Sequence, residues 1–185
     1  MDRDLVIRAR GGDHDAFARL AAGSIGRLNA IARLILSDYG LAEDAVQEAL
    51  VSAWRDLRGL RDPERFDAWL NRVLIRACQD ARRRESRRRR TESILLTAPE
   101  PAEDDIQRPL ATMDQLERGL RRLSVDQRAV VVLTYFLDLP QAEAAASLGI
   151  PIGTMKSRLA RSLAALRASI EADERLAIQP AERPA

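Results

Sequence analysis

Polar and cationic side chains near the C-terminus have the types and the spacing that contact nucleic acid. The stretch LDLPQAEAAASLGIPIGTMKSRLARSLAALR, residues 137–167, contains Lys156, Arg158 and Arg161 close together, beside the hydroxyls of Thr154 and Ser157. Arginine can donate two hydrogen bonds to a guanine edge, and arginine or lysine can pair with a phosphate. DNA binding is one interpretation of this stretch, and a helical hairpin with a solvated charged face is the other.

Residue types that perform catalysis or bind metals are scarce in the chain. There is one cysteine, Cys78, and one histidine, His14, so neither a disulfide within the chain nor a site of several cysteines can form. The sequence contains no glycine-rich phosphate loop and no paired acidic motif. We therefore expect no catalytic residue, no metal site and no cofactor, and we expect Cys78 to pack as a small apolar residue and His14 to lie in an exposed loop.

Composition favours a helical protein. The 185 residues are 46% hydrophobic and only 4% aromatic, and runs of strand-forming residues are rare. The first ten residues, MDRDLVIRAR, carry charges every few positions, which differs from a signal peptide. No apolar run approaches the ~20 residues that cross a bilayer. The sequence predicts an all-α protein without membrane insertion, located in the cytoplasm.

Apolar residues at spacings of three and four predict several helices in the N-terminal half. Residues 2–36 read as two helices separated by Gly11 and Gly12, and residues 42–57 as another with an apolar stripe. A further helix is expected after Pro63, with Trp69 on its inward face beside Phe66, and it runs into the arginine-rich segment 76–90. We predict that residues 1–90 form one helical domain.

The sequence changes character after residue 90. Residues 91–109 mix prolines with acidic residues and lack periodicity, which is typical of a flexible linker. Helical spacing resumes over 110–172, where Ser124 and Gln127 match a capping box. Residues 173–185 read as a flexible tail. Apolar residues expected on the inner faces of this second domain are Ala129, Leu133, Phe136, Ala142, Ala145, Ala146 and Leu148.

A glycine turn divides the C-terminal stretch into two helices. Gly149 permits a positive φ, and Pro151 suits the first position of the next helix. In that helix Met155, Leu159, Leu163, Leu166 and Ile170 share one face. Ser157 and Arg161 then project away from the core, with Thr154 and Arg158 to one side and Lys156 to the other. This is the helix-turn-helix pattern, whose second helix can enter the major groove.

The whole arrangement resembles a family of bacterial proteins. AEDAVQEALVSAW, an FDAWLNRV stretch, the arginine run, the linker and GTMKSRLARSLAALR follow one another as in sigma factors of RNA polymerase. More narrowly, the chain is similar to the extracytoplasmic-function (ECF) group of the sigma-70 family, from about residue 10 to residue 168. The resemblance implies a subunit that gives core polymerase its promoter specificity.

The resemblance also implies a role for each segment. The helix of residues 42–57 would bind the clamp helices of the largest polymerase subunit, and the flap would be a second contact of core RNA polymerase. The polymerase-binding residues would be Asp44, Gln47, Glu48 and Ser52. The residues at the −10 promoter element would be Arg61, Arg65, Asn71, Arg72, Arg76, Arg83 and Arg84. The residues at the −35 element would be Thr154, Lys156, Ser157, Arg158 and Arg161.

The resemblance also implies a further partner, and it leaves some roles open. Members of the family are usually held inactive by an anti-sigma factor, so such a partner is expected. The family often has asparagine where this chain has Arg76, which implies an altered −10 preference. The acidic linker could mimic nucleic acid or could be a passive tether. The alternative function is a stand-alone helix-turn-helix regulator that does not join polymerase. A third possibility is an enzyme, but the scarcity of reactive residues argues against it.

Overall fold

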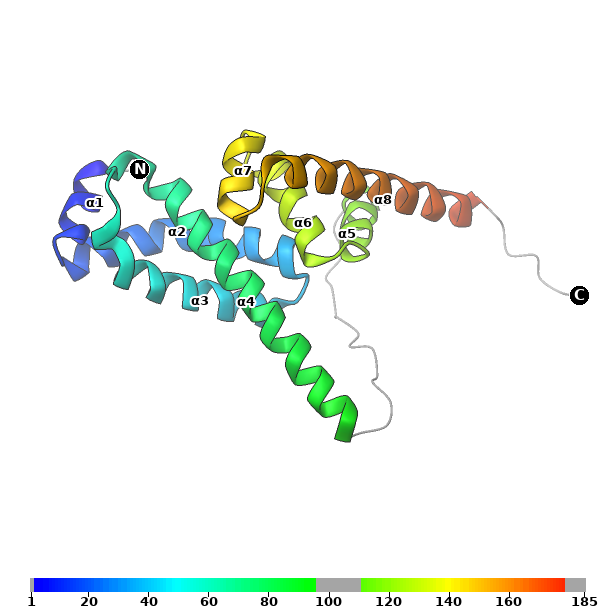
Figure 1. Cartoon of the computed structure of the whole chain (residues 1–185), viewed down its shortest axis with the longest axis horizontal. Coiled ribbons are helices and arrows are strands. Elements are labelled where there is room, and N and C mark those ends of the chain that lie inside the picture. Colours follow the sequence, from blue (N-terminus) through cyan, green and yellow to red (C-terminus); the bar gives the residue numbers. More distant parts are fainter. Residues whose placement is uncertain (1, 96–110, 179–185) are drawn as a thin grey trace, which may run out of the picture. The chain divides into compact units, whose positions relative to one another are not determined.

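The computed structural model describes residues 2–95 and 111–178, and these are helical with short turns between the helices (Figure 1). This confirms the all-α prediction. Packing divides the chain into two compact units, of which one holds α1–α4 and the other holds α5, α6, α8 and most of α7. The central part of the predicted linker and the end of the predicted tail lie outside the described residues.

Four helices build the N-terminal unit. They are α1 (Arg3–Arg10), α2 (His14–Leu36), α3 (Tyr39–Asp56) and α4 (Phe66–Leu95), and two 3₁₀ turns, Leu57–Gly59 and Pro63–Arg65, lie between α3 and α4. α2, α3 and α4 pack against one another and α1 packs on α2. The core consists of small and aliphatic side chains, among which Leu28, Ile31, Ile35, Leu70 and Leu74 are fully buried.

Aspartates cap the first three helices of this unit. Asp2, Asp13 and Asp38 accept hydrogen bonds from the backbone N–H groups at the start of α1, α2 and α3. An N-cap carboxylate satisfies donors that have no partner within the helix. The cap at Asp38 starts α3 at Tyr39, so the predicted start at residue 42 was wrong, and SDYGL belongs to the cap and the first turn.

α4 is longer than the sequence pattern indicated. It continues through the arginine run to Leu95, whereas the linker was expected to begin at residue 91. Figure 1 shows its last turns running past the ends of α2 and α3. Arg87 and Arg90 are exposed there, while Ala81 and Glu85 are still buried. The apolar stripe therefore stops before the helix does.

The C-terminal unit consists of α5 (Ala111–Arg121), α6 (Val125–Val131), a π-helical turn (Val132–Phe136), α7 (Gln141–Leu148) and α8 (Ile152–Ile178). The predicted capping box is confirmed. The Ser124 hydroxyl accepts from the Gln127 N–H at 3.3 Å, and the Gln127 side chain accepts from the Ser124 N–H at 2.9 Å. α6 and α5 both pack on α8.

The π-helical turn changes which residues of this segment face inward. Ala129 and Leu133 are buried as predicted, but Phe136 is 52% exposed and its predicted place on the inner face was wrong. The Leu137 N–H bonds to the carbonyl of Val132, five residues back, at 3.0 Å. The wider turn moves Phe136 away from the inward stripe that α-helical spacing would give it.

The helix-turn-helix forms around the expected glycine, with a shifted inner face. Gly149 has φ of +66°, and α8 begins at Ile152, one residue after Pro151. Ala145 and Leu148 are buried as predicted, but Ala142 and Ala146 are exposed and Ala144 is buried in their place. On α8, Met155, Leu159 and Leu166 are buried and Leu163 and Ile170 are half-buried, as predicted.

Arg118 of α5 and Arg122, the residue that follows α5, contact the far end of α8. The Arg122 guanidinium donates to Asp173 at 2.8 Å and to the Ser169 hydroxyl at 2.6 Å, and Arg118 lies 3.5 Å from Asp173. Hydrogen bonding from Arg122 lowers the pKa of Asp173. These contacts keep the chain helical past residue 172, where the tail was expected to begin.

Candidate nucleic-acid and protein interfaces

α3 presents a polar face that agrees with the predicted polymerase-binding set. Asp44 and Gln47 are exposed, and Glu48 and Ser52 are half-buried beside them. Ala42, Ala45, Val46, Ala49 and Ala53 bury the opposite face of the helix. The alanines let α3 lie close to its neighbours, so that its polar residues stand on a firmly packed support.

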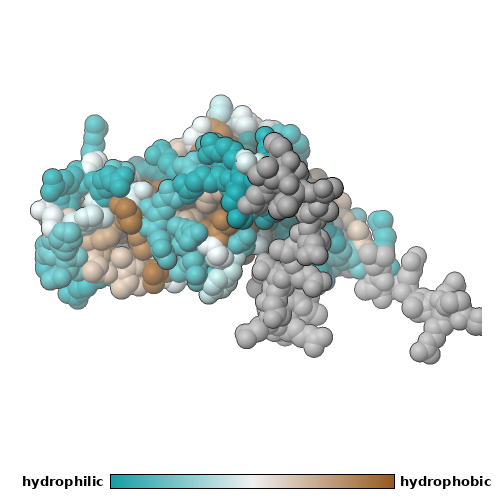
Figure 2. Space-filling view, turned by 90° about the horizontal axis from the view of Figure 1, so that it is seen from below, coloured by the Kyte–Doolittle hydropathy of each residue, from teal (hydrophilic) through white to brown (hydrophobic). Residues whose placement is uncertain are grey.

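Apolar side chains also reach the surface of this unit. Figure 2 shows apolar patches between hydrophilic ones on the face seen from below. On α3, Val51 is 58% exposed, and the Tyr39 ring is exposed with the Arg33 guanidinium 3.9 Å from its centroid. Exposed apolar side chains beside charged ones are typical of surfaces that bind another protein.

Glu48 is directed toward α4. The Arg84 guanidinium donates to Glu48 through both of its terminal nitrogens, one of them at 3.0 Å, and this hydrogen bonding lowers the pKa of Glu48. Arg84 was expected at the −10 element and Glu48 at the polymerase. The structure brings the two side chains together, so one residue from each predicted set forms a contact between helices.

The segment between α3 and α4 places two predicted arginines in solvent. Arg61 and Arg65 are exposed. The segment is held to α1, because Arg10 donates to the carbonyl of Leu60 at 3.1 Å. Asp62 accepts from the Glu64 N–H at 3.0 Å and caps the turn that leads into α4. The two arginines therefore stand on a loop with a fixed backbone.

Asn71 differs from the other residues predicted at the −10 element. Its side chain is buried, with 6% exposed, and its amide oxygen accepts a hydrogen bond from Arg27 of α2. Arg27 also donates to Asp67 at 2.6 Å. Arg27 and Asp67 line a cavity of about 310 Å³, to which Arg19 also contributes. In this structure Asn71 positions Arg27, a residue that the sequence analysis did not single out.

The remaining arginines predicted at the −10 element lie on α4. Arg76 and Arg83 are exposed and Arg72 is half-buried. Arg83 has an ion pair with Asp80 of its own helix, at 3.4 Å. Trp69, expected in the core, is half-buried with its ring 5.9 Å from that of Phe66.

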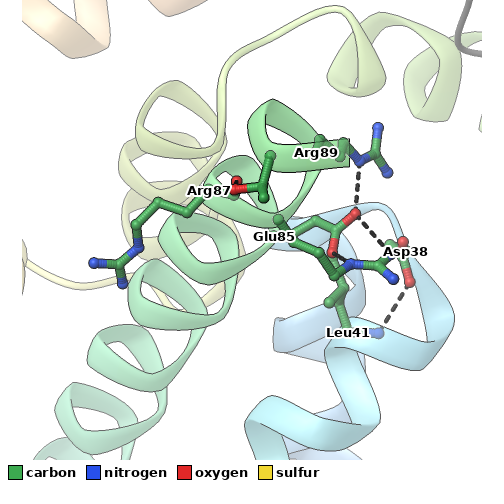
Figure 3. Close-up of polar contacts among 7 residues, drawn as sticks. Asp38, Leu41, Glu85, Arg87 and Arg89 are labelled. Atoms are coloured by element: carbon green, nitrogen blue, oxygen red, sulfur yellow. Dashed lines mark hydrogen bonds and ion pairs between the residues drawn. The ribbon is translucent and has the colours of Figure 1, made fainter. Parts of the chain in front are cut away.

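Glu85 is a second residue that sequence reasoning missed. Only 7% of it is exposed, although it lies within the arginine run. It accepts hydrogen bonds from Arg88 at 2.9 Å and from Arg89 at 2.6 Å, which lowers its pKa to about 2. Figure 3 shows Glu85 and Arg89 on the side of α4 that faces Asp38 and Leu41, while Arg87 points the other way. The only sequence signal is an acid three and four residues before arginines.

The outer face of α8 agrees with the helix-turn-helix prediction. Lys156, Ser157 and Arg161 are exposed, and Thr154 is half-buried. Arg161 donates through Nε to the carbonyl of Ser157 at 3.2 Å, so its side chain lies along the helix. Arg158 is half-buried and lies 3.4 Å from Asp126 of α6. Thr154, Lys156, Ser157 and Arg161 therefore reach solvent. Within the described residues, Lys156 and Arg161 form no ion pair with another helix.

The two residues that could have been reactive have packing roles. Cys78 is buried, and burial raises the pKa of its thiol to about 12. His14 is exposed as expected, but it is the first residue of α2 and not a loop residue, and its ring lies 4.2 Å from that of Trp54. Within residues 2–95 and 111–178 no three His, Cys, Asp or Glu side chains are grouped to hold a metal ion. No helix in the described ranges is long and apolar enough to cross a membrane.

Comparisons with known proteins agree with this arrangement. Residues 24–88 match the family model described as Sigma-70 region 2, and residues 113–166 match Sigma-70, region 4. The chain is similar to the ECF RNA polymerase sigma factor SigM of Mycobacterium tuberculosis, at 33% identity over 89% of this chain and 82% of the relative. It is also similar to the RNA polymerase sigma factor CnrH of Cupriavidus metallidurans, at 30% identity over 93% and 95%.

Solved structures resemble the fold over most of its length. CnrH in complex with the cytosolic domain of CnrY has a TM-score of 0.62 at 30% identity, covering 93% of this chain and 98% of that one. The sigma factor RpoE of Bartonella quintana, in complex with the anti-sigma factor NepR, has a TM-score of 0.67 at 27% identity, covering 85% and 98%. The chain therefore belongs to the ECF sigma factors of the sigma-70 family, which are non-enzymatic initiation factors that direct RNA polymerase to promoters.

Proposed function

We propose that this sigma factor binds core RNA polymerase through the polar face of α3 and reads its promoters at two separate elements. The observation that carries the proposal is the outer face of α8, where Lys156, Ser157 and Arg161 are exposed directly after the Gly149 turn. A helix presented in this way can enter the major groove. The apolar side chains Met155 and Leu159 hold its other face in the core of the unit.

At the −35 element, the five side chains have different contributions. Arg161 and Lys156 are long, exposed donors suited to guanine edges. Thr154 and Ser157 can donate to bases or phosphates. Arg158, which is close to Asp126, is better placed for the phosphate backbone at the edge of the groove.

At the −10 element, the arginines on the loop before α4 and at the start of α4 bind the DNA. Arg61 and Arg65 approach from the loop, and Arg72 and Arg76 from the first turns of the helix. Bases that leave the stack need a pocket and cations nearby for the phosphates. Asn71 acts indirectly, because it is buried and holds Arg27 beside the cavity.

At the polymerase, Asp44 and Gln47 form the exposed centre of the surface that binds the clamp helices, with Glu48 and Ser52 at its margin. The flap is proposed as the second contact of the core enzyme. An anti-sigma factor is a further proposed partner. Its support is that two similar sigma factors have been solved in complex with CnrY and NepR.

Footprinting of the reconstituted holoenzyme on a promoter tests the assignment of the two elements. We expect protection over both elements with the wild-type chain. Arg161→Ala should weaken protection of the −35 element, while Arg61→Ala with Arg65→Ala should weaken the −10 element and leave the −35 contact in place. Loss of both footprints with either variant would contradict separate reading of the two elements.

A further inference from the structure

The cavity beside Arg27 lies where the start of α1, the middle of α2 and the start of α4 meet. Its volume of about 310 Å³ is at the lower end of the range for sites that bind small molecules. None of its lining residues belongs to the sets predicted to contact polymerase or DNA. The charged side chains that line it are Asp2, Arg19, Arg27 and Asp67.

Two arginines of α2 stand on either side of a gap that opens into this cavity. Arg19, Gly23 and Arg27 follow one another at a spacing of four residues and therefore lie along one side of the helix. The two arginine positions are about 12 Å apart along the helix axis. Gly23 leaves the space between them open, because even a Cβ at this position would meet no atom within 4 Å.

The Arg27 guanidinium is held in place and still has donors to offer. It donates one hydrogen bond to Asn71 and another to Asp67, the latter at 2.6 Å. A guanidinium has five N–H donors, so further donors remain for a ligand. Because buried Asn71 fixes the group in advance, little side-chain freedom is lost when a ligand binds.

Ser24 adds a buried polar group without a partner. Only 2% of the residue is exposed, it lines the cavity, and its hydroxyl forms no hydrogen bond with another described residue. Buried polar side chains usually have such a partner, often the carbonyl one turn earlier in the helix. Arg19 is exposed and forms no ion pair within the described residues. Donors from Arg19, Ser24 and Arg27 are therefore available on one side of the cavity.

An acceptor of opposite charge faces the same cavity. Asp67 is already paired with Arg27, whereas Asp2 forms no ion pair within the described residues. Oδ1 of Asp2 accepts from the N–H groups of Asp4 and Leu5, at 3.0 and 3.4 Å, which leaves Oδ2 available. The cavity thus combines an unpaired cation and an unpaired anion that do not neutralise each other.

We propose that this cavity binds a small zwitterion of the amino-acid class. The ligand carboxylate accepts hydrogen bonds from the two arginines and from the Ser24 hydroxyl, and the ligand ammonium group donates to Asp2. Hydrogen bonds between charged groups are stronger than neutral ones, so both ends of the ligand contribute to affinity. Leu5 and Leu20 supply apolar surface for the rest of the molecule.

Two other ligands fit the lining less well. A bare anion would use the arginines but would also meet the Asp2 carboxylate, which repels it. A base flipped out of promoter DNA is uncharged, and proteins hold such bases by stacking and by hydrogen bonds to the base edge. No aromatic side chain lines the cavity.

Thermal unfolding of the full chain with single ligands tests the proposal. The probes are each of the common amino acids, with acetate and inorganic phosphate as bare anions. At least one amino acid should raise the melting temperature, by roughly 10 °C at about 100 times its Kd, and the bare anions should not. Absence of a shift with every amino acid, or an equal shift with acetate or phosphate, would overturn the proposal.

Matched variants locate the binding. Gly23→Leu fills the gap between the arginines and should abolish the shift. Gly26→Leu adds the same side chain to the same helix outside the cavity, also at a position without a Cβ contact, and should keep the shift. Loss in both variants, or in neither, would contradict binding in this cavity.

Two polar variants test the assigned contacts by calorimetric titration of the amino acid that binds. Arg19→Gln should weaken binding by about 10- to 100-fold, as for a lost hydrogen bond to a charged group. Ser24→Ala should weaken it by about 3- to 10-fold without lowering the melting temperature of the ligand-free chain, because the hydroxyl has no partner there. Unchanged affinity in both variants would overturn the assignment.

Promoter opening by the reconstituted holoenzyme distinguishes a small ligand from a promoter base. Without added ligand, Gly23→Leu and Gly26→Leu should open a promoter as the wild type does. A loss of opening confined to Gly23→Leu would assign the cavity to a base of the promoter and would overturn the proposal.

Discussion

Arg84 of α4 donates two hydrogen bonds to the carboxylate of Glu48 on α3, and so joins a helix assigned to polymerase to a helix assigned to DNA. The contact has consequences for both assignments. Arg84 is therefore less available to phosphates than Arg87 and Arg90, which have no ion pair within the described residues. Glu48 is held at the margin of the α3 surface, with its pKa lowered by Arg84.

Exchanging the two charges separates the structural from the functional role of the pair. Glu48→Arg alone places two cations together and should lower the stability of the N-terminal unit by up to about 1 kcal/mol, since about half of each side chain is exposed to solvent. Glu48→Arg with Arg84→Glu should restore the unfolding midpoint. It should not restore affinity for core polymerase. Full recovery of that affinity would mean that Glu48 serves only to hold α4.

Protonation of Glu85 should loosen the end of α4 in acid. The folded pKa is about 2, below the ordinary value of 4.5, because Arg88 and Arg89 donate to the carboxylate. A carboxylate with a lowered pKa stabilises the fold above pH 4.5, and this contribution disappears as the pH falls toward 2. Helicity measured by circular dichroism should fall over this window more in the wild type than in Glu85→Gln. Identical curves would show that the pair contributes nothing to the helix.

Arg161 should determine a base in the −35 element. Arg161→Ala should weaken promoter binding by about 1–3 kcal/mol and relax the preference at one position, as expected for an arginine that reads a guanine. Arg167→Ala is the matched control, because Arg167 is an exposed arginine further along the same helix. Binding to a set of promoters with single changes in the −35 element gives the result. A uniform loss over the set would indicate a phosphate contact instead.

Gly119 permits the close approach of α5 to α8. A Cβ at this position would lie 2.6 Å from Cδ1 of Leu166, which is itself buried. Gly119→Ala should therefore destabilise the C-terminal unit by about 1 kcal/mol. Gly26→Ala in α2 is the control, because its Cβ would meet no atom within 4 Å and should add about 0.5–1 kcal/mol of stability. Denaturant unfolding of both variants measures the difference, and a stabilised Gly119→Ala would contradict the packing argument.

Helical periodicity, turn chemistry and the family resemblance together predicted the fold class, the helix-turn-helix and the sigma factor family, which the structure and the comparisons confirm. A stand-alone regulator would leave α3 and α4 without a role. Residue-level errors arose where local spacing is ambiguous. Consecutive alanines at 144–146 give no sign of which one faces inward, and the π-helical turn rotates Phe136 outward although its spacing is helical.

Contacts between distant segments were beyond sequence reasoning. Nothing in the spacing indicates that Asn71 bonds to Arg27, 44 residues earlier, or that Arg84 bonds to Glu48, 36 residues earlier. Glu85 looked like one charge in a solvated run, because its burial depends on the start of α3. These contacts decide which polar side chains are available to partners, and the assignments to DNA and polymerase remain predictions at the level of single residues.

Run-off transcription tests the central claim most directly. The purified chain is added to sigma-free core polymerase with a pool of promoters from the same genome. We predict selective initiation at a subset of promoters, lost when Asp44→Lys reverses the charge at the exposed centre of α3 and kept in Arg167→Ala. Transcripts no more selective than those of core polymerase alone, from a chain that is folded and binds DNA, would contradict the account.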